Sequence, residues 1–151
     1  MPDTSPHTPS LYETDFHAWA NEQATLLRAG RLEQADIANI AEEIESMGRA
    51  EKRELVSRLA VLLMHLLKWR YQSTHRNTSW RLTIEGQRFE ILDHLADNPS
   101  LRSKLAEVLT SAYRRARIEA AKETGLAIAT FPPICPWRYD EIMDEGFWPE
   151  T

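Results

Sequence analysis

Three neighbouring glutamates and two histidines are the residues of this chain whose chemistry most suggests a catalytic or metal site. They are Glu42, Glu43, Glu45, His65 and His94. Carboxylates and imidazoles can share a proton or bind a divalent ion. On a helix, however, Glu43 and Glu45 border opposite edges of the apolar stripe and Glu42 points away, given 3.6 residues per turn. The three glutamates are therefore not expected to converge on one ion.

Sequence motifs for metal or cofactor binding are also missing. Neither Glu-x-x-His nor His-Glu-x-x-His occurs, and a single cysteine, Cys135, excludes a zinc finger. Glycine-rich phosphate loops and nucleophile elbows are absent as well. We therefore predict no metal, no cofactor and no catalytic residue, with Glu43 and Glu45 paired to neighbours such as Arg49 and Arg53.

The stretch 68–88 combines positive charge with aromatic rings. Its basic residues are Lys68, Arg70, Arg76, Arg81 and Arg88, interleaved with Trp69, Tyr71, His75 and Trp80. Single-stranded nucleic acid or a phosphorylated ligand requires charge for phosphate and rings for stacking. Trp69 and Trp80 nevertheless fall on apolar stripes of predicted helices, which favours a structural role. We expect the cations to pair with the acidic segment 33–54.

A small-ligand pocket is the other interpretation of this region. Its candidate lining residues are His65, Trp69, Trp80, Arg81 and Arg88. His65 lies one helical turn before Trp69, and an imidazole there could act as a general base near neutral pH. Histidines at the edge of an apolar stripe are more often held by one or two structural hydrogen bonds. The structural role is therefore the favoured one.

These residues must be positioned by a helical scaffold organised around the stretch 40–71. One apolar stripe of its second half contains Leu55, Leu59, Leu62, Leu66 and Trp69, and another contains Val56, Ala60, Leu63 and Leu67. The two stripes lie about 100° apart around the helix. A helix that is apolar over so much of its circumference must be packed on at least two sides.

Two shorter helical patterns come before this stretch. The first begins at Asp15 or at the threonine before it, which can cap the helix, and stops at Gly30. The second begins at Asp36. Its apolar face contains Ile37, Ile40, Ala41, Ile44 and Met47. We expect Gly48 to break or kink the chain, so that the central helix begins at about Ala50.

The rest of the chain predicts two more helices and an irregular end. After a loop at 72–79, a helix capped by Thr78 or Ser79 runs to about residue 95, with both of its faces buried, Leu82 and Phe89 included. The next begins near Pro99 and ends near Thr124, before Gly125. Residues 126–151 combine prolines with bulky aromatics and suit a wrap around the bundle, with a turn of helix at 139–143. The fold class is thus all-α, a bundle of about five helices.

Composition limits the function further. The chain has 151 residues, 42% of them hydrophobic, which suits a single domain at 11–151 after a flexible tail at 1–10. A net charge of −5 argues against a nucleic acid partner. The longest apolar run, 59–67, is too short to span a membrane. One cysteine fits a reducing compartment, so we expect a cytoplasmic protein without a membrane partner.

Several sequence blocks in a fixed order resemble a known bacterial family. They are EEIESMGRAEKREL, HLLKW, SWRLTIEGQR and TGLAIATFP followed by CPW. The family is known as domain of unknown function 29, and the resemblance runs from LYETDFHAW at 11–19 to the acidic aromatic end at 145–150. It implies a small, mainly helical bacterial protein and transfers no catalytic or binding residues.

Three hypotheses of function follow. The leading one is a non-enzymatic helical interaction or regulatory module that binds a protein partner or a second copy of itself. The second is a ligand-binding protein or enzyme with the pocket at His65, Trp69, Trp80, Arg81 and Arg88. The third is a nucleic-acid-associated regulator that uses the stretch 68–88.

Overall fold

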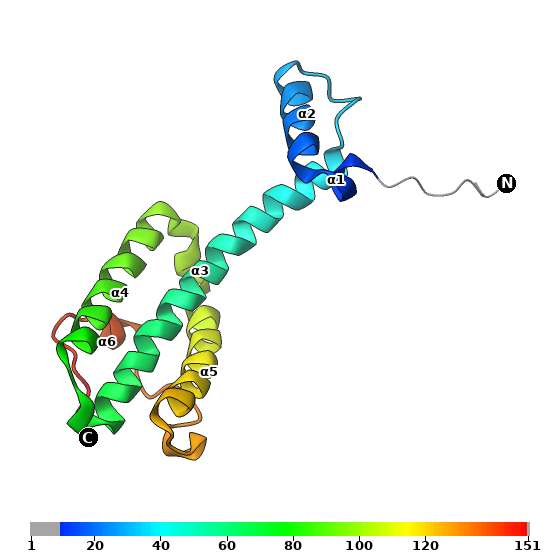
Figure 1. Ribbon diagram of the computed structural model, residues 1–151. Helices are drawn as coiled ribbons and strands as arrows, with labels where there is room; N and C mark the ends of the chain where they lie inside the picture. The colour runs from blue at the N-terminus through cyan, green and yellow to red at the C-terminus, as the bar shows by residue number, and fades with distance from the viewer. Residues whose placement is uncertain (1–9, 151) are drawn as a thin grey trace. The chain divides into compact units, whose positions relative to one another are not determined.

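The computed structural model describes residues 10–150, and every regular element in that range is helical (Figure 1). The α-helices are α1 (Leu11–Thr14), α2 (Phe16–Arg28), α3 (Ile37–Tyr71), α4 (Thr78–Asp97), α5 (Leu105–Thr124) and α6 (Tyr139–Met143), with short 3-10 helices at Ser73–His75, Pro99–Lys104 and Ile128–Thr130. This confirms the all-α prediction. The expected flexible tail at 1–10 lies almost wholly outside the described residues.

The chain divides into two compact units, residues 1–49 and 50–151. No linker marks this division in the sequence, because α3 continues across it. The expected break at Gly48, with a central helix beginning at about Ala50, is therefore wrong, since this glycine lies inside one helix of 35 residues. The alternative of a kink at Gly48 stays a prediction. A glycine in a helix costs only about 1 kcal/mol relative to alanine, which the long helices on both sides of it can absorb.

Helix α2 of the first unit is capped largely as the sequence predicts. Asp15 accepts a hydrogen bond from the backbone N–H of Ala18 at 3.0 Å, and Gly30 follows the helix in the left-handed conformation at φ +71°. The indole N–H of Trp19 donates to Asp36 at 3.2 Å, and Gln23 accepts from the Asp36 backbone N–H at 2.7 Å. These bonds fix α2 against the start of α3.

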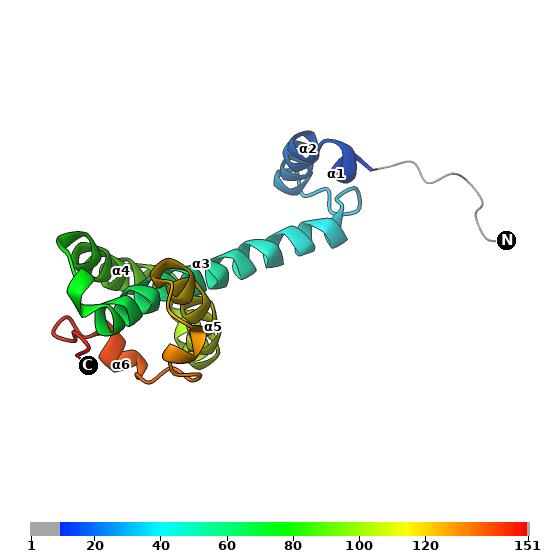
Figure 2. The ribbon, with the colours of Figure 1, turned by 60° about the horizontal axis from the view of Figure 1, so that its bottom comes forward.

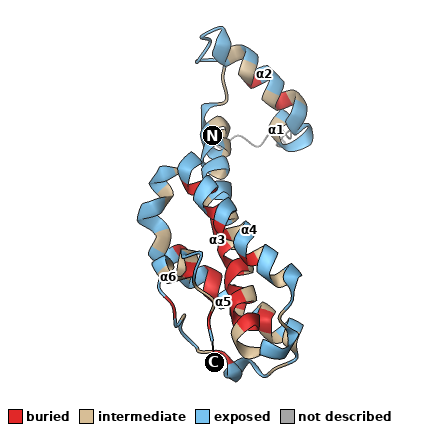
Figure 3. Cartoon of the chain, turned by 90° about the vertical axis from the view of Figure 1, so that its left-hand side faces the viewer, coloured by how far each residue is buried: buried red, intermediate tan, exposed pale blue. Residues whose placement is uncertain are grey.

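The core of the second unit surrounds the C-terminal half of α3. Six leucines of this half are fully buried: Leu55, Leu59, Leu62, Leu63, Leu66 and Leu67. Helices α4 and α5 flank it on different sides, and buried residues gather along the three facing surfaces (Figures 2 and 3). Packing on at least two sides is thereby confirmed.

Helix α4 differs from the prediction in two respects. Its cap is Asn77, whose side chain accepts a hydrogen bond from the N–H of Trp80 at 2.8 Å, so neither Thr78 nor Ser79 caps it. The expected burial of both faces is also wrong, because Leu82 is 59% exposed and Phe89 is 67% exposed. Only the face with Ile84, Ile91 and Leu95 packs on the core.

The C-terminal segment contributes its aromatic residues to the core, as expected for a wrap. Phe131 is fully buried and meets the ring of Tyr71 edge-on, with the ring centroids 5.2 Å apart. The ring of Trp148 lies 4.8 Å from that of Trp69. The end of the chain therefore closes the part of the core that α4 and α5 leave open.

We expect the substitution Trp69→Ala to lower the free energy of unfolding by about 3–5 kcal/mol, the range for deleting a buried aromatic side chain. Trp69 is only 7% exposed and packs on Trp148. Urea denaturation followed by circular dichroism measures the change. The matched control is Leu82→Ala on the exposed face of α4, which should shift stability by less than about 0.5 kcal/mol. Equal losses in both variants would contradict the placement of Trp69 in the core.

Candidate functional site

The C-terminal tryptophan Trp148 gathers several of the residues that the sequence nominated for ligand binding. The guanidinium groups of Arg81 and Arg88 lie 4.7 Å and 5.3 Å from the centre of its ring. Trp69 stacks on the same ring, and Arg81 also lies 5.7 Å from Trp69. Such cation–π contacts contribute about 0.5–2 kcal/mol each. Three of the five nominated residues thus surround a side chain of the protein itself.

Arg88 is the most deeply buried charged group of this cluster. Its Nε donates to the carbonyl oxygen of Ile142 at 2.8 Å, and Nη2 donates to that of Phe147 at 2.6 Å. The third nitrogen, Nη1, is buried and has no hydrogen-bond partner among residues 10–150. Burial lowers the pKa of Arg88 from its ordinary value. The guanidinium therefore fastens the C-terminal segment to α4.

The other two nominated residues lie in separate surroundings. His65 is half-buried, its Nδ1 lies 2.8 Å from the carbonyl oxygen of Val61, and burial lowers its pKa. Trp80 faces Lys68, whose Nζ lies 4.5 Å from the centre of the indole ring. The hydrogen bond of His65 fits the structural role favoured above. Ligand binding by the five residues stays a prediction.

Two of the five basic residues of the stretch 68–88 pair with acids that follow this stretch in the chain. Lys68 binds Glu123 at 2.6 Å, and Arg76 binds Glu150 at 3.3 Å. The expected pairing with the acidic segment 33–54 is wrong for these two. Sequence periodicity could not reveal these pairs, because their members are far apart along the chain. Lys68, Arg76 and Arg88 are thus already bound to carboxylates or backbone carbonyls, and the absence of a nucleic acid partner stays a prediction.

The glutamates 42, 43 and 45 do not form one site with the histidines. Glu42 and Glu45 approach Arg49 at 2.9 Å and 3.7 Å, which confirms the expected pair for Glu45. Glu43 instead accepts a hydrogen bond from the hydroxyl of Tyr12, so its predicted pairing with arginine is wrong. Sequence patterns on a single helix could not show this contact, since Tyr12 belongs to α1.

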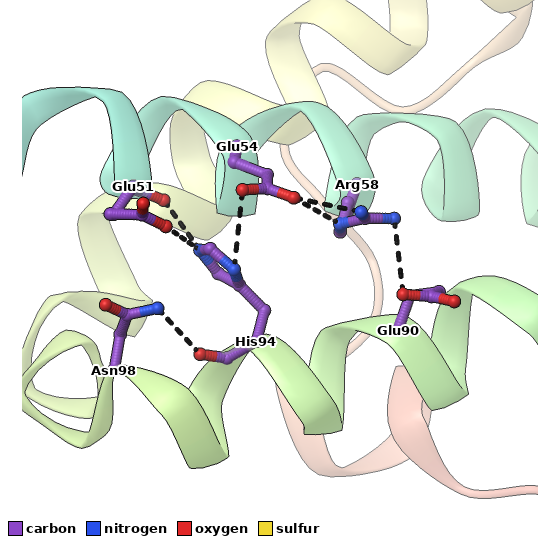
Figure 4. A network of polar contacts seen from close by, with 6 residues as sticks. All are labelled: Glu51, Glu54, Arg58, Glu90, His94 and Asn98. Atoms are coloured by element: carbon purple, nitrogen blue, oxygen red, sulfur yellow. Dashed lines mark hydrogen bonds and ion pairs between the residues drawn. The ribbon is translucent and has the colours of Figure 1, made fainter. Parts of the chain in front are cut away.

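A different set of acids does meet a histidine. Figure 4 shows Glu51 and Glu54 of α3 opposite His94 of α4, with Arg58 and Glu90 next to them. One ligand-type atom from each of Glu51, Glu54 and His94 lies within 4.8 Å of the others. The sequence pattern had suggested only Glu42, Glu43 and Glu45 as partners of His94. This set belongs to two helices, and their register is not visible in the sequence.

The first unit offers a surface of another kind. Among its described residues Trp19 is the one buried hydrophobic side chain. Its exposed large hydrophobic residues are Leu11, Phe16, Leu27, Leu32, Ile37, Ile44 and Met47. The last three form an apolar stripe with Ala41, which is also exposed, and we refer to Ile37, Ala41, Ile44 and Met47 as the α3 stripe. The sequence identified this stripe correctly but not that it would remain exposed.

The only cysteine has no feature of a catalytic nucleophile. The thiol of Cys135 donates to the carbonyl oxygen of Trp137 at 3.3 Å, and burial raises its pKa. An activated thiol instead needs a lowered pKa from a neighbouring base or cation. The geometry of Cys135 therefore fits a packing role.

The geometry defines a class of protein: an all-helical chain with a polar cluster between two helices and an exposed apolar stripe. Comparison with known families places the chain more closely. Residues 11–148 match the family described as domain of unknown function DUF29, and the chain belongs to this family. No curated protein and no solved structure matches it. No helix of the described residues is long and apolar enough to cross a membrane.

We expect Arg88→Lys to destabilise the second unit by about 1.5–3 kcal/mol, the contribution of a hydrogen bond to a charged group. Lysine retains the charge but cannot donate in two directions from a planar fork. Urea denaturation and the rate of proteolysis after residue 140 should both report the change. Arg81→Lys is the matched control, because Arg81 is exposed and its recorded contacts are with two aromatic rings. Unchanged proteolysis of the Arg88 variant would contradict the fastening role.

Proposed function

We propose that this chain is a non-enzymatic protein-interaction module of the bacterial cytoplasm, and that its α3 stripe binds a basic amphipathic helix of another protein. The observation that carries the proposal is the exposure of this stripe. Ile44 is 59% exposed and Met47 is 62% exposed, on a helix that continues into a buried core. The single cysteine supports a reducing compartment.

The stripe has the dimensions of a helix-docking surface. From residue 37 to 48 it extends for about three helical turns, or about 17 Å at 1.5 Å per residue. Gly48 follows Met47 at its end, and, apart from its two chain neighbours and the backbone of its own helix, no atom of the described residues lies within 4 Å of the place where a side chain would begin. A partner helix can therefore approach the backbone closely there. Apolar positions spaced by three or four residues are the usual anchors when an amphipathic helix binds such a surface.

Charge identifies the chemistry of the partner. Residues 1–49 contain nine acidic and three basic residues, a formal charge of −6, whereas residues 50–151 contain fourteen and fifteen, a charge of +1. These values sum to the −5 of the whole chain. The first unit thus combines exposed apolar residues with all of the chain's excess negative charge. A basic partner complements it, whereas two copies of the unit would repel each other.

The two other hypotheses have less support from the contacts. Three of the five candidate pocket residues surround Trp148, and the cations Lys68 and Arg76 are already paired with acids. Neither ligand binding nor nucleic acid binding explains the exposed stripe. Ligand binding and nucleic acid binding remain alternatives, and measurements of peptide and oligonucleotide binding can distinguish them from the leading proposal.

Synthetic peptides of about five helical turns provide the test, one with a leucine face and lysines elsewhere, and one with glutamates in place of the lysines. We expect fluorescence anisotropy to show binding of the basic peptide, weakened by added salt, and no binding of the acidic one. Burying an isoleucine side chain contributes about 1.5–3 kcal/mol, so Ile44→Asp should lower the affinity at least tenfold. A short oligonucleotide should not compete.

The matched control is Phe89→Asp, which adds the same charge to an exposed apolar site of the second unit. It should leave peptide binding unchanged. Equal binding of both peptides, or equal loss in both variants, would overturn the proposal. Sedimentation equilibrium tests whether a second copy of the chain, and not a basic helix of another protein, covers the α3 stripe. A dimer that dissociates in the Ile44→Asp variant would show that it does.

A further inference from the structure

We propose that Glu51, Glu54 and His94 form a binding site for a divalent transition-metal ion, with His94 Nδ1 and Glu54 Oε2 as its central ligands. The ligand set of one imidazole and two carboxylates suits zinc, iron or manganese. This site is independent of the α3 stripe, which belongs to the other compact unit.

The hydrogen bonding of His94 leaves one ring nitrogen directed at a carboxylate. The side chain is 8% exposed, and its Nε2 lies 2.8 Å from the backbone carbonyl oxygen of Glu51. A carbonyl only accepts, so Nε2 carries the hydrogen and, in the neutral ring, Nδ1 carries a lone pair. Oε2 of Glu54 lies 3.6 Å from Nδ1, beyond hydrogen-bond distance. Two electron-rich atoms therefore face each other, and a positive charge between them would stabilise both.

The separation of these two atoms suits ligands of one ion. Zinc binds histidine nitrogen at about 2.0–2.1 Å and carboxylate oxygen at about 2.0–2.2 Å, so two such ligands at the tetrahedral angle lie about 3.4 Å apart. The observed 3.6 Å requires almost no movement. Glu51 approaches from the other edge of the ring, with Oε2 3.6 Å from Nε2. Its side chain is half exposed and can rotate to supply the third ligand.

The neighbouring groups hold the two central ligands in place. The Nε2–H bond to a backbone carbonyl is the usual support of a metal-binding histidine, because it fixes the tautomer and the ring orientation. Arg58 donates to Oε1 of Glu54 from two nitrogens, at 3.1 Å and 2.9 Å. That leaves Oε2 for the ion. Figure 4 shows Arg58 on the side of Glu54 away from the histidine.

The surrounding cavity is suited to a hydrated cation. It has a volume of about 400 Å³ and is lined by Glu51, Glu54, Arg58, Glu90, Asp93, His94, Asp97 and Asn98. Five of these side chains are carboxylates and one is an arginine. The excess of negative charge attracts a cation, and the volume accommodates the waters that would complete its coordination. The open side also gives the ion a path of entry.

A proton is the competing occupant of the gap between Nδ1 and Glu54. A protonated imidazole would donate to the Glu51 carbonyl and point its second N–H at Glu54. The two occupants predict different results with Zn²⁺: a metal site binds the ion stoichiometrically and releases any proton from Nδ1, whereas a gap suited only to a proton does not bind it.

The test is a titration of the full chain, without an affinity tag and after chelator treatment, with Zn²⁺ at pH 7.5 by isothermal calorimetry. We expect one equivalent to bind in the micromolar range or tighter and to raise the melting temperature. Glu54→Gln removes the ligand charge at a partly exposed position and should weaken binding at least tenfold. Glu51→Gln should weaken it less. Glu119→Gln removes a partly exposed carboxylate that does not line this cavity and should leave the affinity unchanged.

Three outcomes would overturn the proposal. The first is the absence of stoichiometric Zn²⁺ binding by a folded protein, which would leave the proton as the occupant. The second is binding that survives both Glu54→Gln and His94→Gln. The third is binding that is lost when an exposed histidine is replaced by His75→Gln, because the ion would then be adventitious. Melting curves of each variant without metal show whether it is folded, and the Glu54 variant carries the conclusion if the His94 variant is not.

Discussion

The burial of α3 over almost its whole circumference from Leu55 to Trp69 is the constraint on which the second unit depends. One helix packed against α3 cannot cover an apolar surface of this width, and two packed helices still leave part of that surface exposed. Helices α4 and α5 cover two sides, and the C-terminal segment completes the cover with Phe131 and Trp148. Arg88 is buried for the same reason: the last turn of α6 and the irregular residues after it need donors for their backbone carbonyls. The apolar surface of one helix thus accounts for the positions of three other parts of the chain.

Local features of this fold were predictable because they depend on neighbouring residues. The helix ends are examples. Asp15 caps the start of α2 with its side chain, and Gly30 and Gly125 follow the ends of α2 and α5 in the left-handed backbone conformation. The period of three or four residues identified the buried half of α3 for the same reason. Gly48 shows the limit of local reasoning, because the helix continues through it. The cost of a glycine in a helix, about 1 kcal/mol relative to alanine, is small when helix is already formed on both sides of it, because continuing a helix needs no new nucleation.

The candidate sites depend on contacts between residues far apart in sequence, and these could not be predicted. The sequence nominated His65, Trp69, Trp80, Arg81 and Arg88 because they are close along the chain, yet the side chain that gathers three of them is Trp148. The sequence pattern also suggested the wrong glutamates as neighbours of His94. Glu51 and Glu54 lie near this histidine only because of the register in which α3 packs against α4. The exposure of the α3 stripe could not be predicted for a similar reason. Periodicity shows that one face of a helix is apolar, but not whether other residues of the same chain cover that face.

The distribution of polar groups along α3 explains why a metal site would form where it does. Between Met47 and Leu55 the helix carries no large apolar side chain, and Glu51 and Glu54 lie within the last turn before the fully buried part begins. His94 lies opposite, beside the buried Leu95 of α4. Carboxylates at the edge of a core stay accessible to water, while the core residues next to them hold the imidazole rigid. A metal ion there would join α3 to α4 at the end of their apolar contact, where side-chain packing no longer does so.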